Sequence, residues 1–309
     1  MAISDFRSRH SSDTANHISI LAPYTGLILA ITLCILFLFK NYILEPFLPR
    51  IYGRHHSCLS EITKRSFLNQ HVATGMRIII LALGGYPFFA VVFGRSLLSD
   101  PVVHGGKVAM GDCLVVSSQL LVGMYIFELI YRAKVSFVGS LHHLGTVLVG
   151  QSSVAISIHG HKDARFEFIL CCVWGAVDVI VEFLPSLTII RYRTAPTSHA
   201  HLHSLFKFTM IWTFIGTLLG SIIAMYLFGI LWSEWELSFK IATPLLHIAF
   251  LAAQLHGTNI LRKMMIREGK RMRGGVMSTE KQGSECGALK KKVSGSTDAG
   301  SSLGSLSVV

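Results

Sequence analysis

Seven stretches of the chain are long and apolar enough to cross a lipid bilayer, and this feature limits the possible folds more than any other. A helix needs about 20 apolar residues to cross a hydrocarbon core of about 30 Å. Such stretches extend approximately over Leu21–Phe39, Met76–Phe93, Cys113–Tyr131, Gly139–Ile158, Phe166–Ile190, Leu205–Trp232 and Ser238–Leu261. Composition agrees, because 51% of the residues are hydrophobic and only 15% are charged. We therefore predict an all-α fold, a polytopic membrane helix bundle of about seven transmembrane helices.

The chain divides into four segments by composition. Residues 1–20 are largely polar, residues 21–65 hold the first apolar stretch and a basic loop, and residues 66–270 hold the other six stretches. The polar start is too long for the basic region of a cleavable signal, so the first helix is predicted to be retained. Residues 271–309 are rich in Gly, Ser and Lys, contain no aromatic residue, and are predicted to be a disordered tail.

Lysine and arginine are distributed unevenly between the two sets of connecting segments. The N-terminal segment and the connections predicted on its side of the membrane hold six of them. The opposite set, which includes the segment after Ile190 and the residues after Leu261, holds far more. Because cytoplasmic loops carry the excess of basic residues, we predict a luminal or exterior N-terminus and a cytosolic C-terminus. Topology and anionic lipid headgroups account for the net charge of +11, so no nucleic-acid partner is predicted.

Cysteine and histidine patterns do not predict a metal site or a cofactor. The six cysteines form no CxxC pair, which argues against a disulfide framework and against structural zinc. The segment HAHLH, residues 199–203, could bind a surface metal adventitiously, but its residues are predicted to be solvated loop histidines. A di-iron desaturase would require HxxxH and HxxHH spacings, which the histidine clusters lack.

Acidic residues inside the fifth apolar stretch require a physical reason. An acidic side chain at the centre of a transmembrane helix costs about 2.5–3.5 kcal/mol on insertion scales. Asp178 and Glu182 are four residues apart and therefore share one face of a helix. Two neighbouring carboxylates do not readily both ionise in a low dielectric, so one is protonated or a cation or hydrogen-bond donor lies opposite. That face is predicted to point into the protein.

Other polar residues fall at the same predicted depth, in the cytosolic half of the bundle. They are Glu128, His142, His143, Gln254, His256 and Asn259. Such groups could simply pair and hold helices together, at roughly 0.6 kcal/mol for each interhelical hydrogen bond. Their concentration at one level favours a shared internal cavity used for binding or catalysis.

These residues resemble the TLC domain, the family of translocating-chain-associating, longevity-assurance and ceroid-lipofuscinosis membrane proteins. The aromatic and acidic helix MYIFELIYR, residues 124–132, precedes HHLGT, residues 142–146, which is similar to the HHxxT of the ceramide-synthase branch. Asp178 and Glu182 resemble the second Asp and the Glu of that branch's HDxxDxxxE stretch, although Trp174 and Gly175 replace its first His and Asp. The resemblance covers about Ser66 to Lys270.

The resemblance implies residence in the endoplasmic reticulum and a role in lipid homeostasis, for which two alternatives are open. In the first, a polar intramembrane cavity binds a sphingolipid or phospholipid, so membrane lipid is the partner. The protein could also form a homo- or hetero-oligomer. In the second, the protein is a ceramide-synthase-like N-acyltransferase that uses acyl-CoA as co-substrate and a long-chain base as acceptor. No other cofactor is implied.

The acyltransferase alternative gives roles to particular residues. His142 or His143 accepts the proton of the attacking amine, because an unperturbed imidazole pKa of about 6.5 suits general base catalysis, and Asp178 orients the imidazole or the amine. The predicted substrate-binding residues are Glu128, Thr146, Glu182, Gln254 and His256 around the cavity, with Arg132, Arg191 and Arg193 beside the CoA headgroup.

Two further membrane classes are less well supported. Seven spans with an exterior N-terminus also describe a receptor, but the chain has no DRY-like or NPxxY-like stretch. A transporter would show broken helices in related halves. Pro87, Pro185 and Pro244 could break helices, but no internal repeat accompanies them, so kinks are predicted instead.

Overall fold

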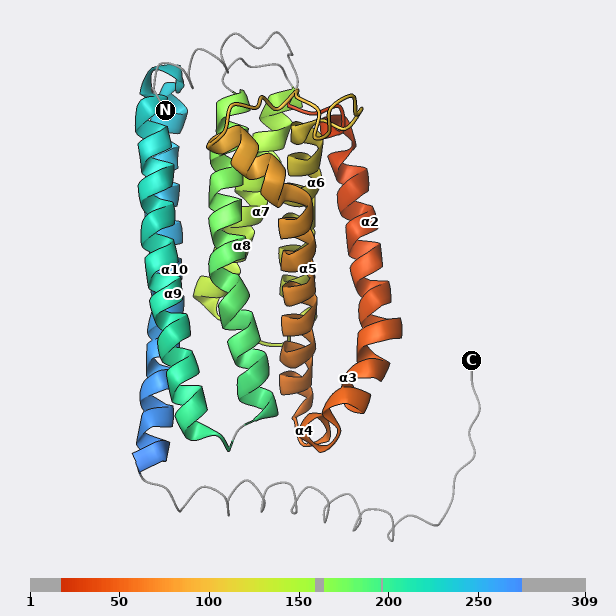
Figure 1. The fold of residues 1–309 in the computed structure, drawn as a ribbon, viewed down its shortest axis with the longest axis vertical. Coiled ribbons are helices and arrows are strands. Elements are labelled where there is room, and N and C mark those ends of the chain that lie inside the picture. Colours follow the sequence, from red (N-terminus) through yellow and green to blue (C-terminus); the bar gives the residue numbers. More distant parts are fainter. Residues whose placement is uncertain (1–17, 159–163, 196, 274–309) are drawn as a thin grey trace, which may run out of the picture.

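The computed structural model describes residues 18–158, 164–195 and 197–273, and in these ranges the chain folds almost entirely into helices. The helix bundle is shown in Figure 1, with α2 along one side and the α9–α10 pair along the other. The long helices α5, α6, α7 and α8 lie between them. The predicted all-helical bundle is therefore confirmed. The N-terminal residues 1–17 and nearly all of the predicted disordered tail lie outside the described residues.

The first apolar stretch forms a helix that continues well past its predicted end. A 3-10 turn, η1 (Ala22–Tyr24), leads into α2 (Thr25–Leu38), a π-helical segment η2 (Phe39–Leu44) and α3 (Glu45–Tyr52). The short α4 (Arg54–Ser57) follows after a turn at Gly53, whose φ of 49° is a conformation that glycine adopts without a Cβ clash. The predicted loop after Phe39 is therefore helical as far as Tyr52, and Leu44 and Leu48 of this extension pack into the core.

Two helices, α5 (Glu61–Val92) and α6 (Met110–Tyr131), form the centre of the bundle. The first begins fifteen residues before its apolar stretch, where the Ser60 hydroxyl accepts a hydrogen bond from the Thr63 amide and caps the helix. Gly84 allows close packing of α5 and α6, since a Cβ at this position would lie 2.6 Å from the Ser117 hydroxyl oxygen. Two small residues therefore meet at this point of the packing surface, as is common between membrane helices.

The remaining helices are α7 (Phe137–Ile158), α8 (Ala164–Thr194), α9 (His199–Ile230) and α10 (Leu237–Arg273), with a 3-10 turn, η3 (Trp232–Glu234), before the last. His199 and His203 belong to the first turns of α9, so the prediction of loop histidines was wrong. The His199 Nδ1 lies 2.7 Å from the fully buried Glu268 carboxylate, and the His203 Nδ1 lies 2.9 Å from the Met265 carbonyl oxygen. These contacts join the start of α9 to the end of α10.

Six of the described helical segments are long and apolar enough to span a membrane. They are Ala22–Tyr52, Glu61–Val92, Met110–Tyr131, Arg165–Thr194, His199–Ile230 and Leu237–Arg273. The seventh predicted span corresponds to α7, which is 22 residues long but is less apolar because it contains His142, His143 and Gln151. In Figure 1, α2 begins at the upper end of the bundle and α10 finishes at the lower end.

Candidate functional site

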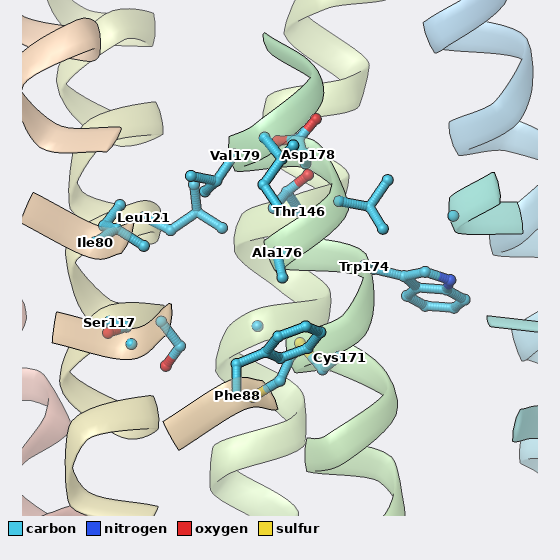
Figure 2. Close-up of a pocket in the computed structure, with 18 of the residues that line it drawn as sticks. Ile80, Phe88, Ser117, Leu121, Thr146, Cys171, Trp174, Ala176, Asp178 and Val179 are labelled. Atoms are coloured by element: carbon cyan, nitrogen blue, oxygen red, sulfur yellow. The ribbon is translucent and has the colours of Figure 1, made fainter. Parts of the chain in front are cut away.

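A cavity of about 150 Å³ lies inside the bundle, and its lining residues come from all six helices α5 to α10. Most of its wall is apolar, with Ile80, Phe88 and Leu121 among the lining side chains. Figure 2 shows Asp178 and Thr146 toward one end of the cavity and Phe88 and Cys171 toward the other. The cavity is therefore a largely apolar chamber, with Asp178 and Thr146 at one end and Ser117 nearer the other.

The polar end of the cavity is organised around Asp178. The His142 Nε2 lies 3.3 Å from one oxygen of its carboxylate, and the Gln254 amide donates to the same oxygen at 2.8 Å. The Tyr125 hydroxyl donates a hydrogen bond to the other oxygen. Helices α6, α7, α8 and α10 thus each supply one side chain to this cluster. The predicted convergence of His142, Asp178 and Gln254 on one cavity is present in the structure.

A second acidic cluster lies beside the first, at Glu128 of α6. The His143 Nε2 lies 3.5 Å from the Glu128 carboxylate, and Arg132, one turn further along α6, forms an ion pair with the same group. The His143 ring stacks on Tyr125, with ring centroids 4.3 Å apart. Tyr125 therefore packs against both histidine rings, and each histidine faces a different carboxylate. The sequence left two alternatives, polar groups that only pair with one another and polar groups that share a cavity. Both occur here, because the groups are paired and the first cluster also lines the cavity.

Sequence reasoning missed a buried cation at the centre of the bundle. Arg77 of α5 is only 4% exposed, and one of its terminal nitrogens donates to the Ser186 hydroxyl at 2.8 Å. It also lies within electrostatic range of Asp178 and Glu182. Arg77 is therefore the opposing cation that two neighbouring carboxylates require. The signal in the sequence was a lone arginine inside the predicted stretch Met76–Phe93.

These groups form a continuous polar layer across the bundle. The layer consists of Arg77, Tyr125, Glu128, Arg132, His142, His143, Asp178, Glu182, Ser186 and Gln254. Its three carboxylates face two arginines, so one negative charge is left for a proton or for a ligand to balance. Buried charges persist only where they are paired or hydrogen-bonded, which explains why the layer is so densely connected.

Not every predicted site residue joins the layer. Thr146 lines the cavity, and its hydroxyl donates to the His142 carbonyl oxygen in the preceding turn of α7. His256 and Arg191 are exposed, and the structure does not bring either of them to the cavity. Arg193 is half-buried near Arg132. The prediction misplaced His256 because a helix of 3.6 residues per turn puts it about 200° around α10 from Gln254.

Several buried polar atoms at the site have no hydrogen-bond partner within the described part of the chain. They are the Nδ1 atoms of His142 and His143, the Nε1 of Trp174, the Oε1 of Gln254, and the hydroxyls of Ser117 and Thr217. All except His143 belong to residues that line the cavity. An unsatisfied buried polar group costs about 1–3 kcal/mol, so these atoms are the natural contacts for a bound molecule or for water.

No protein-family model, curated protein or solved structure matches the chain. The resemblance to the TLC domain therefore depends on the motifs quoted above and stays a prediction.

Proposed function

We propose that the protein is a TLC-type integral membrane protein of lipid homeostasis whose cavity binds a lipid of the sphingolipid or phospholipid class. One observation supports this most directly: the apolar chamber ends at the hydrogen-bonded group of His142, Asp178 and Gln254. A cavity that is apolar along its wall and polar at one end suits an amphipathic molecule. The hydrocarbon part then lies against the wall, and the polar part contacts the unpartnered nitrogen and oxygen atoms.

We further propose the orientation and location of the protein in the cell. The lower end of the bundle in Figure 1, where α10 finishes, carries the excess of arginine and lysine and faces the cytosol. The endoplasmic reticulum is the proposed compartment, on the TLC resemblance. In this orientation the C-terminus of the chain is cytosolic.

Lipid binding is tested by filling the cavity. Gly85 lines the cavity, and a Cβ at this position meets no atom within 4 Å, so Gly85→Phe projects a ring into open space. Gly75→Phe is the matched control, because Gly75 lies on the same helix with equally open surroundings but does not line the cavity. Lipids extracted from each purified protein are quantified by mass spectrometry. We expect a lipid species to be retained by the wild type and Gly75→Phe and lost from Gly85→Phe; equal retention by all three would contradict the proposal.

One observation favours acyl transfer as a second candidate function. His142 lines the cavity with its Nε2 facing Asp178 and its Nδ1 free of a partner among the described residues. Asp178 holds the ring in position, while the free nitrogen can take a proton from an amine as that amine attacks the thioester carbonyl of acyl-CoA. A carbon–nitrogen bond then forms, the carbon–sulfur bond breaks, and the departing CoA thiolate takes up a proton.

The acyltransferase activity is tested in membranes that contain the protein, acyl-CoA and sphinganine. N-acylated product is expected from the wild type and not from His142→Ala. His143→Ala should retain part of the activity, because His143 contacts Glu128 and Tyr125 and does not line the cavity. A well-folded wild type that forms no product contradicts this second function and leaves lipid binding as the proposal.

A further inference from the structure

The cavity is too small to enclose the hydrocarbon tail of a membrane lipid. Its volume is about 150 Å³. An apolar cavity of similar size engineered into another protein holds a single benzene molecule, that is, about six carbon atoms. If the proposed function is correct, most of the bound lipid chain must therefore lie outside this volume. The chain then leaves the cavity between two helices, and the packing of the helices indicates where this is possible.

Close glycine contacts seal the α8–α9 and α5–α6 sides of the cavity. A Cβ at Gly220 of α9 would lie 2.4 Å from the Val177 side chain of α8, and one at Gly216 would lie 2.6 Å from Val181. On the α5–α6 side, the corresponding approach is 2.6 Å, from Gly84 to Ser117. Distances this short leave no room for a chain to pass between these helices at the level of Gly84, Gly216 and Gly220.

The seam between α7 and α10 is packed differently. A Cβ at Gly145 of α7 would lie 3.4 Å from the Phe250 ring of α10, which is an ordinary contact distance. The Phe250 ring meets the His142 ring edge-on, with centroids 5.5 Å apart, and lies 5.8 Å from the Trp174 ring. One aromatic side chain therefore fills the space between these two helices at the level of the polar end of the cavity.

The same seam borders the cavity on its inner side and has apolar surface on its outer side. His142, Thr146, Phe250 and Gln254 line the cavity from α7 and α10. Exposed leucines lie within about 60° of Gly145 and Phe250 around their helices: Leu141 and Leu148 on α7, and Leu246 on α10. In a chain that spans a bilayer, a surface of this composition faces lipid tails.

We propose that the hydrocarbon chain of a bilayer lipid passes sideways through the seam between α7 and α10, with Phe250 as the side chain that moves aside. The inference rests on the proposed lipid-binding function and adds the route and the position of the bound chain. The end of the chain occupies the cavity and the remainder lies in the seam, against Phe250 and Trp174.

Trp174 provides a reporter at this seam, because it contacts Phe250 and lines the cavity. Three variants each keep one of the four tryptophans, Trp174, Trp212 or Trp235, with the others changed to Phe. Each variant is reconstituted into phosphatidylcholine vesicles whose acyl chains carry bromine, which quenches indole fluorescence on contact. Trp212 is 42% exposed and reports full contact with lipid, whereas Trp235 is 3% exposed and reports none. We expect Trp174 to be quenched nearly as strongly as Trp212.

A cross-link tests whether the chain reaches Trp174 through the seam. In the Trp174 variant with its native cysteines changed to Ala, Gly145→Cys and Phe250→Cys are joined by a short bifunctional thiol reagent. Val181→Cys and Gly216→Cys, joined in the same way, tie α8 to α9 and form the control. We expect the quenching of Trp174 to be lost when α7 and α10 are joined, to persist in the control, and to return when the reagent is cleaved.

The outcomes separate this inference from the function on which it rests. Quenching of Trp174 that survives the α7–α10 cross-link overturns the lateral route. The route is also overturned if bromine quenches Trp174 as little as Trp235 in a protein that retains lipid and loses it in the Gly85→Phe variant. Lipid binding itself then stands. Loss of both lipid retention and quenching contradicts the proposed function itself.

Discussion

Arg77 shows how strongly a single residue constrains this bundle. It is nearly fully buried, its hydrogen-bond partner Ser186 is neutral, and its charge is balanced by nearby carboxylates. Removing one partner from a buried ionic group is destabilising because the other charge is left without compensation. The residue therefore contributes to stability mainly through the charges that it neutralises, and its effect should depend on whether those charges remain.

A charge-balanced double substitution tests this role. We expect Arg77→Met to lower the free energy of unfolding by about 3–5 kcal/mol, the cost of breaking a buried ion pair from one side. Adding Glu182→Gln removes a negative charge that Arg77 opposes, so the double variant should recover a large part of the loss. Thermal unfolding of the detergent-purified variants measures both effects. If the two substitutions lower the free energy of unfolding additively in the double variant, Arg77 and Glu182 do not interact.

Packing between α8 and α9 is decided at the scale of the element, by glycines that bring the two backbones together. Gly216 and Gly220 lie against Val181 and Val177 at distances that exclude any Cβ. Membrane helices gain little from burying apolar side chains, because lipid tails are equally apolar, so close van der Waals contact carries the association. The tight α8–α9 contact is also what leaves the seam between α7 and α10 as the looser side of the cavity.

Substitution of two glycines on the same helix separates packing from helix propensity. We expect Gly220→Ala to lower the free energy of unfolding by about 1–3 kcal/mol, because its Cβ would overlap Val177. Gly229→Ala, where a Cβ meets nothing within 4 Å, should instead raise it by about 0.5–1 kcal/mol by reducing the freedom of the unfolded chain. Both are read from unfolding midpoints in detergent. Equal effects at the two positions would show that the contact with Val177 is unimportant.

At the scale of the whole molecule, the polar layer determines which helix is least like a membrane span. The histidines that face Asp178 and Glu128 lower the hydropathy of α7, which is not among the six described segments long and apolar enough to span a membrane. Such a helix is stable within a bilayer only when other helices surround its polar face, and α6, α8 and α10 supply that environment here. We therefore expect α7 to cross the membrane together with the six more apolar helical segments.

Glycosylation mapping tests the topology of the complete molecule. An Asn-Ser-Thr acceptor within a long Gly-Ser loop is inserted at one of three places: after Val103, after Lys134, or in the connection that follows α7. Expressed in endoplasmic reticulum membranes, the first and third insertions should be glycosylated and the second should not. The same result for the second and third insertions would show that α7 does not cross. Glycosylation of the second insertion alone would reverse the proposed orientation.

The length, apolarity and order of the helices could be predicted from the sequence, because crossing a bilayer requires long uncharged stretches whatever surrounds them. The helix ends could not: the predicted stretch stops at Phe39, yet the helical segment continues to Tyr52, and α5 begins at its Ser60 cap. Backbone hydrogen bonding extends helices into polar sequence, and an apolar window does not report it.

The pairing of His142 with Asp178 could be predicted from the sequence, because buried polar groups are costly unless they contact one another. Only the tertiary structure decided that Tyr125 stacks on His143, that Arg77 opposes the carboxylates, and that His256 faces away from the cavity. Periodicity along one helix states which residues share a face. The rotation of each helix about its axis, and therefore the partner each face meets, depends on how all of the helices pack together.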